Sequence, residues 1–135
     1  DFEITAESSL NALESFEGLE NLQTIGGNFK VTASSSLTSL TSFKGLNSLK
    51  SIGKLTILNC DSLSSIDDLK NVEALDEISI TGCPKLYDFC ILKNVVQNMS
   101  GTFYVNGNGY NPTKKQLLDG ACSQTPPDDN NNNDN

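Results

Sequence analysis

The sequence has no histidine, and its four cysteines form no pair suited to a metal. Histidine is the commonest metal ligand and general base, so its absence removes the residue on which most catalytic and metal sites depend. The cysteines stand at positions 60, 83, 90 and 122 without a Cys-x-x-Cys pair, which argues against structural zinc. Serine-rich stretches have no histidine partner to activate a nucleophile. We therefore expect a protein that is not an enzyme and uses no metal or cofactor.

The chain also has few basic residues and no long apolar run. No run approaches the roughly 18 residues of a membrane-spanning helix, so we expect no direct membrane insertion. Nine basic residues against 17 acidic ones leave a net charge of -8, which disfavours nucleic acid and anionic lipid as partners. The sequence starts at Asp1, directly before an apolar alternation. We expect part of a longer chain, with a complete mature protein after signal removal as the alternative.

What the sequence does contain is an internal repeat. Residues 2–26 match residues 29–53 at an offset of 27 without a gap, so that Phe2 falls on Phe29. A third unit opens at residue 55 and a fourth at residue 78, at offsets of 26 and 23. A fifth opens at residue 103 and then departs from the pattern. Units of this length lie in the range of leucine-rich repeats, which bury their apolar side chains by stacking.

Each unit combines two apolar periods. The opening alternates with period two, as in Phe29, Lys30 and Val31, which predicts a strand with one buried face. The rest places an apolar residue at every third position, namely 37, 40, 43, 46, 49 and 52, a spacing that a straight α-helix does not keep. We therefore predict an α/β repeat solenoid of about five rungs over residues 1–122, with a parallel sheet along one side.

The first two units contain five glycines, four of them at matching places. Gly26, Gly27 and Gly53 fall where we expect the chain to turn into the next strand. Gly18 and Gly45 precede a leucine at a place where a side chain would crowd the neighbouring rung. We interpret both sets as structural.

The repeats resemble the receptor L-domain type of leucine-rich repeat. The resemblance is carried by residues 36–57, S-L-T-S-L-T-S-F-K-G-L-N-S-L-K-S-I-G-K-L-T-I, and covers about residues 2–105. This family is known from the ectodomains of the insulin and epidermal growth factor receptors, and similar repeats occur in fungal and bacterial cell-surface proteins. The resemblance implies a right-handed β-solenoid, a sheet face able to bind, and no catalytic residues. Residues 106–122 are similar to the C-terminal cap of bacterial surface versions.

The cysteines suggest covalent links between rungs. Cys60 and Cys83 occupy the same place in consecutive units, and neighbouring strands lie about 4.8 Å apart, close to the Cα separation of a disulfide. We predict a Cys60–Cys83 bridge, with two stacked, buried thiols as the alternative. Cys90 would then pair with Cys122 and hold the last rung, residues 103–122, as a cap. Two bridges favour an oxidising compartment, so we expect a secreted or cell-surface, extracellular protein.

The outward strand positions form two rows on the predicted sheet. One row is Glu3, Lys30, Thr56, Ser79 and Tyr104, and the other is Thr5, Thr32, Leu58, Thr81 and Asn106. Our candidate ligand-facing residues are Glu3, Lys30, Thr32, Thr56, Leu58, Ser79, Thr81 and Tyr104. On this hypothesis the chain is a non-catalytic binding or adhesion module for protein or carbohydrate at a cell surface. The alternative is an ordinary solvated face on a passive spacer or cell-wall scaffold.

Three further expectations concern single segments. Asn98 opens an Asn-Met-Ser run, the N-glycosylation acceptor pattern, which matters only in a eukaryotic secretory pathway. Residues 123–135 are rich in Asn and Asp, have nothing apolar to bury, and are expected to be a disordered linker. No cap is visible before Phe2 and Ile4, so either more rungs precede Asp1 or the first rung exposes an apolar edge.

Overall fold

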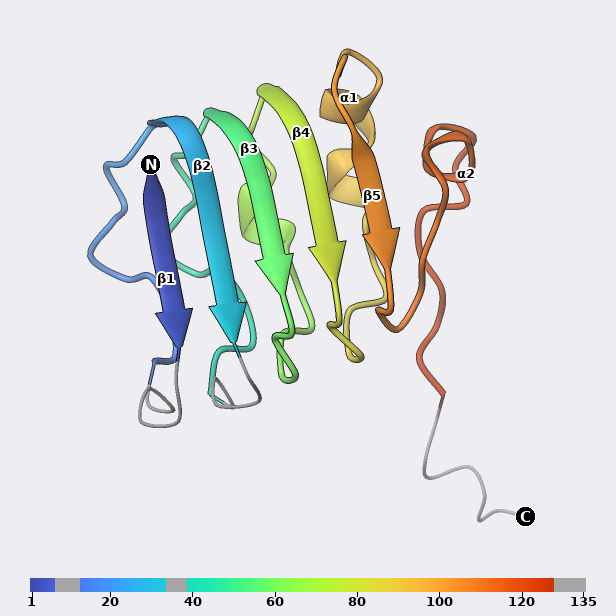
Figure 1. The fold of residues 1–135 in the computed structure, drawn as a ribbon, viewed down its shortest axis with the longest axis horizontal. Helices are drawn as coiled ribbons and strands as arrows, with labels where there is room; N and C mark the ends of the chain where they lie inside the picture. Colours follow the sequence, from blue (N-terminus) through green and yellow to red (C-terminus); the bar gives the residue numbers. More distant parts are fainter. Residues whose placement is uncertain (7–12, 34–38, 128–135) are drawn as a thin grey trace.

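The computed structural model describes residues 1–6, 13–33 and 39–127. Five strands form one parallel sheet in sequence order (Figure 1): β1 (Phe2–Ala6), β2 (Thr24–Ala33), β3 (Ser51–Leu58), β4 (Ala74–Thr81) and β5 (Phe103–Asn106). The helical segments are the short 3-10 turns η1 (Asp67–Leu69) and η2 (Cys90–Leu92) and the helices α1 (Lys93–Val96) and α2 (Lys114–Leu118). The chain is thus a β-solenoid-like stack of about four turns. The predicted parallel sheet is confirmed, but the stack contains less helix than predicted.

The glycines expected at turns lie inside β2 and β3 instead. The register between these strands shifts once, between Ile25 and Asn28, because β2 contains one extra residue there. Gly26 and Gly27 form this bulge. A Cβ at Gly53 would lie 2.6 Å from the carbonyl oxygen of Gly26 and 2.7 Å from that of Gly27. These glycines therefore permit a close approach of two strands at a bulge rather than a change of direction.

The back of each rung is a series of turns and not a helix. The N–H of Leu46 donates to the carbonyl of Phe43, and the N–H of Leu49 donates to that of Leu46, both at 3.1 Å. Each bond spans three residues and returns the next apolar side chain to the interior, which explains the period of three. Leu37 lies outside the described residues. The other five positions are at most 2% exposed: Leu40, Phe43, Leu46, Leu49 and Ile52.

The apolar columns of successive rungs merge into one core. Near the N-terminal end, the ring centroids of Phe16 lie 6.0 Å from Phe29 and 5.6 Å from Phe43, in edge-to-face geometry. Phe2 packs on the same cluster but stays half-buried, as does Ile4. Each fully buried side chain of this size contributes roughly 1.5–3 kcal/mol, so the stack and not the single rung supplies the stability.

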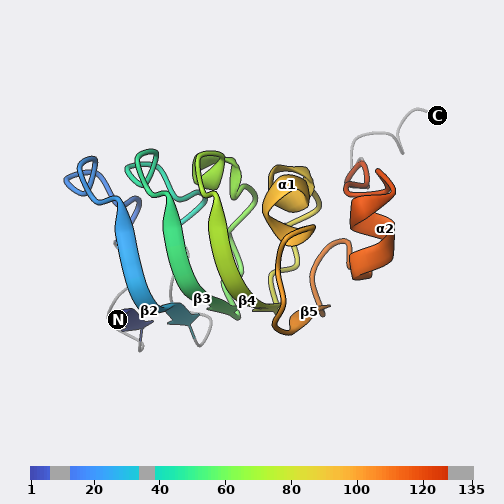
Figure 2. The same cartoon turned by 90° about the horizontal axis from the view of Figure 1, so that it is seen from above.

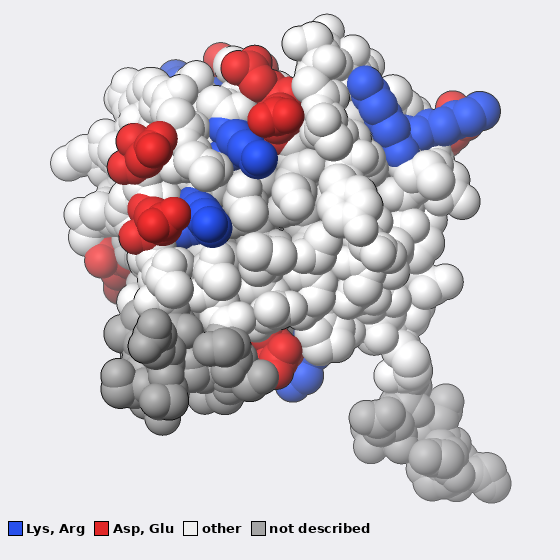
Figure 3. Space-filling model, in the orientation of Figure 1, with Lys and Arg blue, Asp and Glu red and all other residues white. Residues whose placement is uncertain are grey.

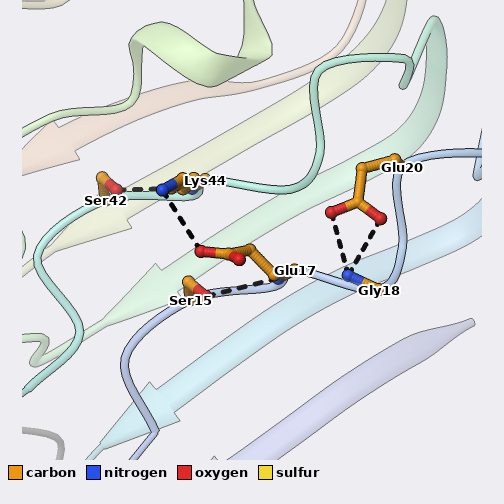
Figure 4. Close-up of polar contacts among 6 residues, drawn as sticks. All are labelled: Ser15, Glu17, Gly18, Glu20, Ser42 and Lys44. Carbon is orange, nitrogen blue, oxygen red and sulfur yellow. Dashed lines mark hydrogen bonds and ion pairs between the residues drawn. The ribbon is translucent and has the colours of Figure 1, made fainter.

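A side-chain turn recurs at the same corner of each rung, and the sequence analysis missed it. In the first rung, the N–H of Glu17 donates to Ser15 Oγ at 3.3 Å (Figure 4). The residue between them is a buried phenylalanine, so the serine satisfies a backbone donor while its neighbour points into the core. Three later rungs repeat the bond, from Lys44 to Ser42, from Asp67 to Ser65 and from Cys90 to Asp88.

The C-terminal end of the solenoid is closed by α2 and a disulfide. The disulfide joins Cys90 to Cys122, as predicted, with a Cα–Cα distance of 4.9 Å. Helix α2 starts with a capping box between Thr113 and Gln116 and places Leu117, fully buried, over the core. Residues 123 and 124 continue the contact through backbone pairing with residues 88 and 87. Residues 128–135, the last part of the expected linker 123–135, lie outside the described residues.

The predicted Cys60–Cys83 bridge is wrong. Both cysteines are free, fully buried thiols, so the alternative of a stacked thiol pair holds. Each thiol donates instead to a carbonyl two residues earlier, Cys60 to Leu58 at 3.7 Å and Cys83 to Thr81 at 3.8 Å. In-register parallel strands keep neighbouring Cβ atoms about 4.8 Å apart, whereas a disulfide needs about 3.8 Å. The Cα spacing used in the prediction is therefore not sufficient.

Burial also protects the thiol pair. The hydrogen bond with Cys83 and burial raise the pKa of the Cys60 thiol far above its ordinary value. Both thiols are fully buried, so the pair behaves as core and not as an exposed reactive site. One disulfide, and not two, is left to support an oxidising compartment.

Candidate binding surface

No other part of the described chain covers the outer face of the sheet. The helices and connecting turns lie on the other side of the sheet or beyond β5 (Figure 2). On β4 the alternation is regular, because Ile78 and Ile80 are buried while Ser79 and Thr81 between and after them are half-buried. The outward side chains are therefore the surface that a partner would meet.

The strand register brings all the candidate residues onto this face. Parallel pairing places them side by side, about 4.8 Å apart, in the two rows that the repeats predict. The first row runs Glu3, Lys30, Thr56, Ser79, Tyr104, and the second runs Thr5, Thr32, Leu58, Thr81, Asn106. The face is consequently continuous from β1 to β5.

Charges on the face are paired and gather on one part of it. Lys30 Nζ lies 3.8 Å from Glu3 Oε2, and Lys54 Nζ lies 3.9 Å from Glu77 Oε1. Sequence reasoning missed the second pair, which forms a further outward row one step towards the strand starts. Figure 3 shows the charged side chains over part of the face and a wide uncharged area beside them. Exposed pairs of this kind contribute at most about 1 kcal/mol each.

Two of the candidate threonines offer less to a ligand than expected. Thr56 is only 9% exposed, and its Oγ1 donates to Asn28 Oδ1 at 3.3 Å. Thr32 Oγ1 is buried and makes no hydrogen bond with the described residues. The middle of the face is therefore packed side chain against side chain, and its more exposed groups lie at the β1 and β5 ends.

The strand β5 forms one exposed end of the face. Tyr104 is 50% exposed, and the amide nitrogen of Asn106 donates to its hydroxyl at 3.3 Å. Leu58, on β3, is half-buried among hydroxyl-bearing neighbours. These side chains combine an aromatic ring, an aliphatic group and hydrogen-bonding groups without a charge.

Elsewhere, the described surface has shallow hollows between rungs. One of them lies between the turn after η1 and α1, and its lining residues include Asn71, Asn94, Gln97 and Asn98. Asn98 is exposed, while Met99 after it is buried. Glycosylation of Asn98 stays a prediction. Within residues 1–6, 13–33 and 39–127, no group of three or more metal-ligating side chains is arranged to hold an ion, and no helix is long and apolar enough to cross a membrane.

The turn side of the first rungs is polar but internally satisfied. The carboxylate of Glu20 accepts the N–H of Gly18 at 2.9 and 3.0 Å, and this hydrogen bond lowers the pKa of Glu20. Lys44 Nζ lies 3.3 Å from Glu17 Oε2 and so links two rungs (Figure 4). These groups serve the turns and each other, which leaves the sheet face as the candidate site.

No protein-family model, curated protein or solved structure matches the chain. The receptor L-domain assignment therefore stays a prediction.

Proposed function

We propose that this chain is a non-catalytic binding or adhesion module that recognises protein or glycan at a cell surface through the outer face of its sheet. The observation that carries the proposal is the uncovered, continuous face, on which two in-register rows of side chains run across all five strands. A parallel sheet backed by one core holds such rows rigidly, so a partner that binds them orders few side chains.

The setting and class belong to the same proposal. The Cys90–Cys122 disulfide favours an oxidising, extracellular compartment. The match between the first two units, which the strand pairing of Glu3 with Lys30 and Thr5 with Thr32 reproduces, favours a right-handed receptor L-domain-like leucine-rich repeat. The paired charges on the face favour neither nucleic acid nor anionic lipid as its partner.

A passive spacer or wall scaffold is the second candidate. It is favoured by the close packing of Thr56 and Thr32, because their buried hydroxyls are not accessible to a ligand. A spacer would need only the stack and its cap.

A pair of matched substitutions separates the two candidates. Thr81→Arg places a long charged side chain on the face, whereas Thr41→Arg, outside the sheet, adds the same group at an exposed position. The chain would be displayed in many copies on beads, and bead adhesion to intact cells would be counted. A binding module predicts at least a tenfold loss for Thr81→Arg and no change for Thr41→Arg, with both circular dichroism spectra unaltered. Equal adhesion of both variants, or none by the unsubstituted chain, contradicts the proposal.

A further inference from the structure

We propose that the sheet face binds a neutral carbohydrate at its β3–β5 end. The side chains concerned, called the neutral strip below, are Leu58, Ser79, Thr81, Tyr104 and Asn106. This inference rests on the proposed function and names the ligand class for it.

The first observation is the exposure of Tyr104. Among the described residues, it is the one large hydrophobic side chain that is neither buried nor half-buried, being 50% exposed. Its register partner is Ser79, whose small side chain leaves the ring uncovered on that side. No described strand pairs with the far edge of β5. The ring is therefore open to a ligand that can pack flat against it.

The second observation is the polar frame around the ring. The amide of Asn106 donates to the tyrosine hydroxyl at 3.3 Å, which restrains both side chains before any ligand arrives. The amide keeps a second N–H and its carbonyl oxygen, and the hydroxyls of Ser79 and Thr81 stand on the neighbouring strand. Sugar hydroxyls act as donors and acceptors at once, which these amide and hydroxyl groups match.

The third observation is the spacing of apolar groups. Leu58 and Tyr104 lie on strands two apart and in different rows, with the hydroxyls of Ser79 and Thr81 between them. They are therefore separated by about 10 Å across the sheet and about 7 Å along it. A sugar ring presents apolar C–H groups on its face and hydroxyls at its rim. Two adjacent rings can thus contact the two apolar groups while their rims meet the hydroxyls.

Charge decides between ligand classes. The neutral strip contains no ionisable carboxylate or amine, and the outward charges beside it are paired, Lys54 with Glu77 at 3.9 Å and Lys30 with Glu3 at 3.8 Å. An acidic glycan or a phosphorylated group would find no free counter-charge there. A protein partner needs a buried anchor pocket at the centre of a larger contact, whereas this strip is flat and has one exposed ring. A neutral oligosaccharide fits best.

The test is binding to a printed panel of defined oligosaccharides. The panel contains neutral chito-, cello-, manno- and galacto-oligosaccharides together with sialylated and sulfated ones. The chain is presented in many copies, because a single flat site binds weakly and multivalency raises the signal. Four variants are compared with the unsubstituted chain: Tyr104→Ala, Tyr104→Phe, Asn106→Ala, and the control Thr5→Ala at the other end of the same face.

We expect binding to at least one neutral oligosaccharide, competed by the same sugar in solution. Tyr104→Ala should lose at least tenfold and Asn106→Ala several-fold, whereas Tyr104→Phe keeps most binding because the ring remains. Thr5→Ala should match the unsubstituted chain. Urea unfolding midpoints within error of one another show that folding is not the cause, since Tyr104 and Asn106 are exposed.

Three outcomes would overturn the inference. Neutral-sugar binding that survives Tyr104→Ala places the site elsewhere. A preference for sialylated or sulfated sugars contradicts the role of charge. No sugar binding, while Thr81→Arg still abolishes bead adhesion to cells, shows that the partner of the face is a protein, so that the proposed function stands and this inference falls. Without sugar binding or Thr81-dependent adhesion, both fall.

Discussion

Replacing Gly45 by alanine measures the contact between the first two rungs, because the chain contains a matched control. Gly45 has a φ of +109°, and a Cβ there would overlap the carbonyl group of Phe16. Gly18, at the same place in the first rung, has a φ of +107° and nothing within 4 Å of such a Cβ. Both variants strain the backbone in the same way, so their difference isolates the rung contact.

The magnitudes follow from the local structure. A non-glycine residue at such a φ costs about 1–3 kcal/mol, which is the full effect expected for Gly18→Ala. In Gly45→Ala the Phe16 backbone must also move, although its N–H donates to the Lys44 carbonyl at 2.7 Å. Losing that hydrogen bond costs about 1 kcal/mol, and loosening the ring contact of Phe16 with Phe43 costs about another 1 kcal/mol. Gly45→Ala should therefore exceed Gly18→Ala by about 2 kcal/mol.

Urea unfolding followed by far-ultraviolet circular dichroism gives the comparison directly. The unsubstituted chain and both variants are unfolded in one buffer, and free energies are compared at a common slope. A repeat stack can lose cooperativity, so an unchanged slope is checked first. Equal destabilisation by the two substitutions would refute the stacked contact on which the fold argument depends.

Three further predictions follow from named contacts. Cys90→Ser with Cys122→Ser should lower the unfolding free energy by roughly 3–4 kcal/mol, since the bridge closes a loop across 32 positions, and a reductant should then have no further effect. Cys60 and Cys83 should react with a thiol reagent only in denaturant, because both are fully buried; labelling of the native chain would contradict this. Glu20→Ala should lower the urea midpoint at pH 7, and by progressively less as the solution is acidified. A lowered folded pKa contributes stability above the ordinary pKa of about 4.3 and loses it as the pH falls through the folded value, so a pH-independent effect would show another cause.

Part of the structure could be predicted from the sequence because each rung repeats the pattern of the preceding one. The gapless offset of 27 predicts that Glu3 pairs with Lys30, and the alternation predicts that both face outward, which the register of β1 and β2 reproduces. The rows of the candidate site follow from the same two patterns. The spacing of three, by contrast, excludes a helix without specifying a turn, so the serine corner that starts at Ser15 was not foreseen.

Other features depend on the burial and the surroundings of single side chains, which the sequence repeat does not specify. Cys60 and Cys83 occupy equivalent places in consecutive rungs, as the repeat predicts, but the repeat does not show that they stay free thiols. Thr56 and Tyr104 share one row, yet Thr56 is nearly buried and Tyr104 is half exposed, because their flanking residues differ in size and β5 ends the sheet.

The sequence by itself therefore determined the repeat, the inward and outward positions of each strand, and the order of the five strands. These follow from chain connectivity and from alternating polarity, which are local. The tertiary structure decided the bulge at Gly26 and Gly27, the free state of the thiol pair, and which outward side chains a partner can reach. Those features depend on the distance between neighbouring rungs and on which end of the solenoid is covered. The sequence of a single repeat specifies neither.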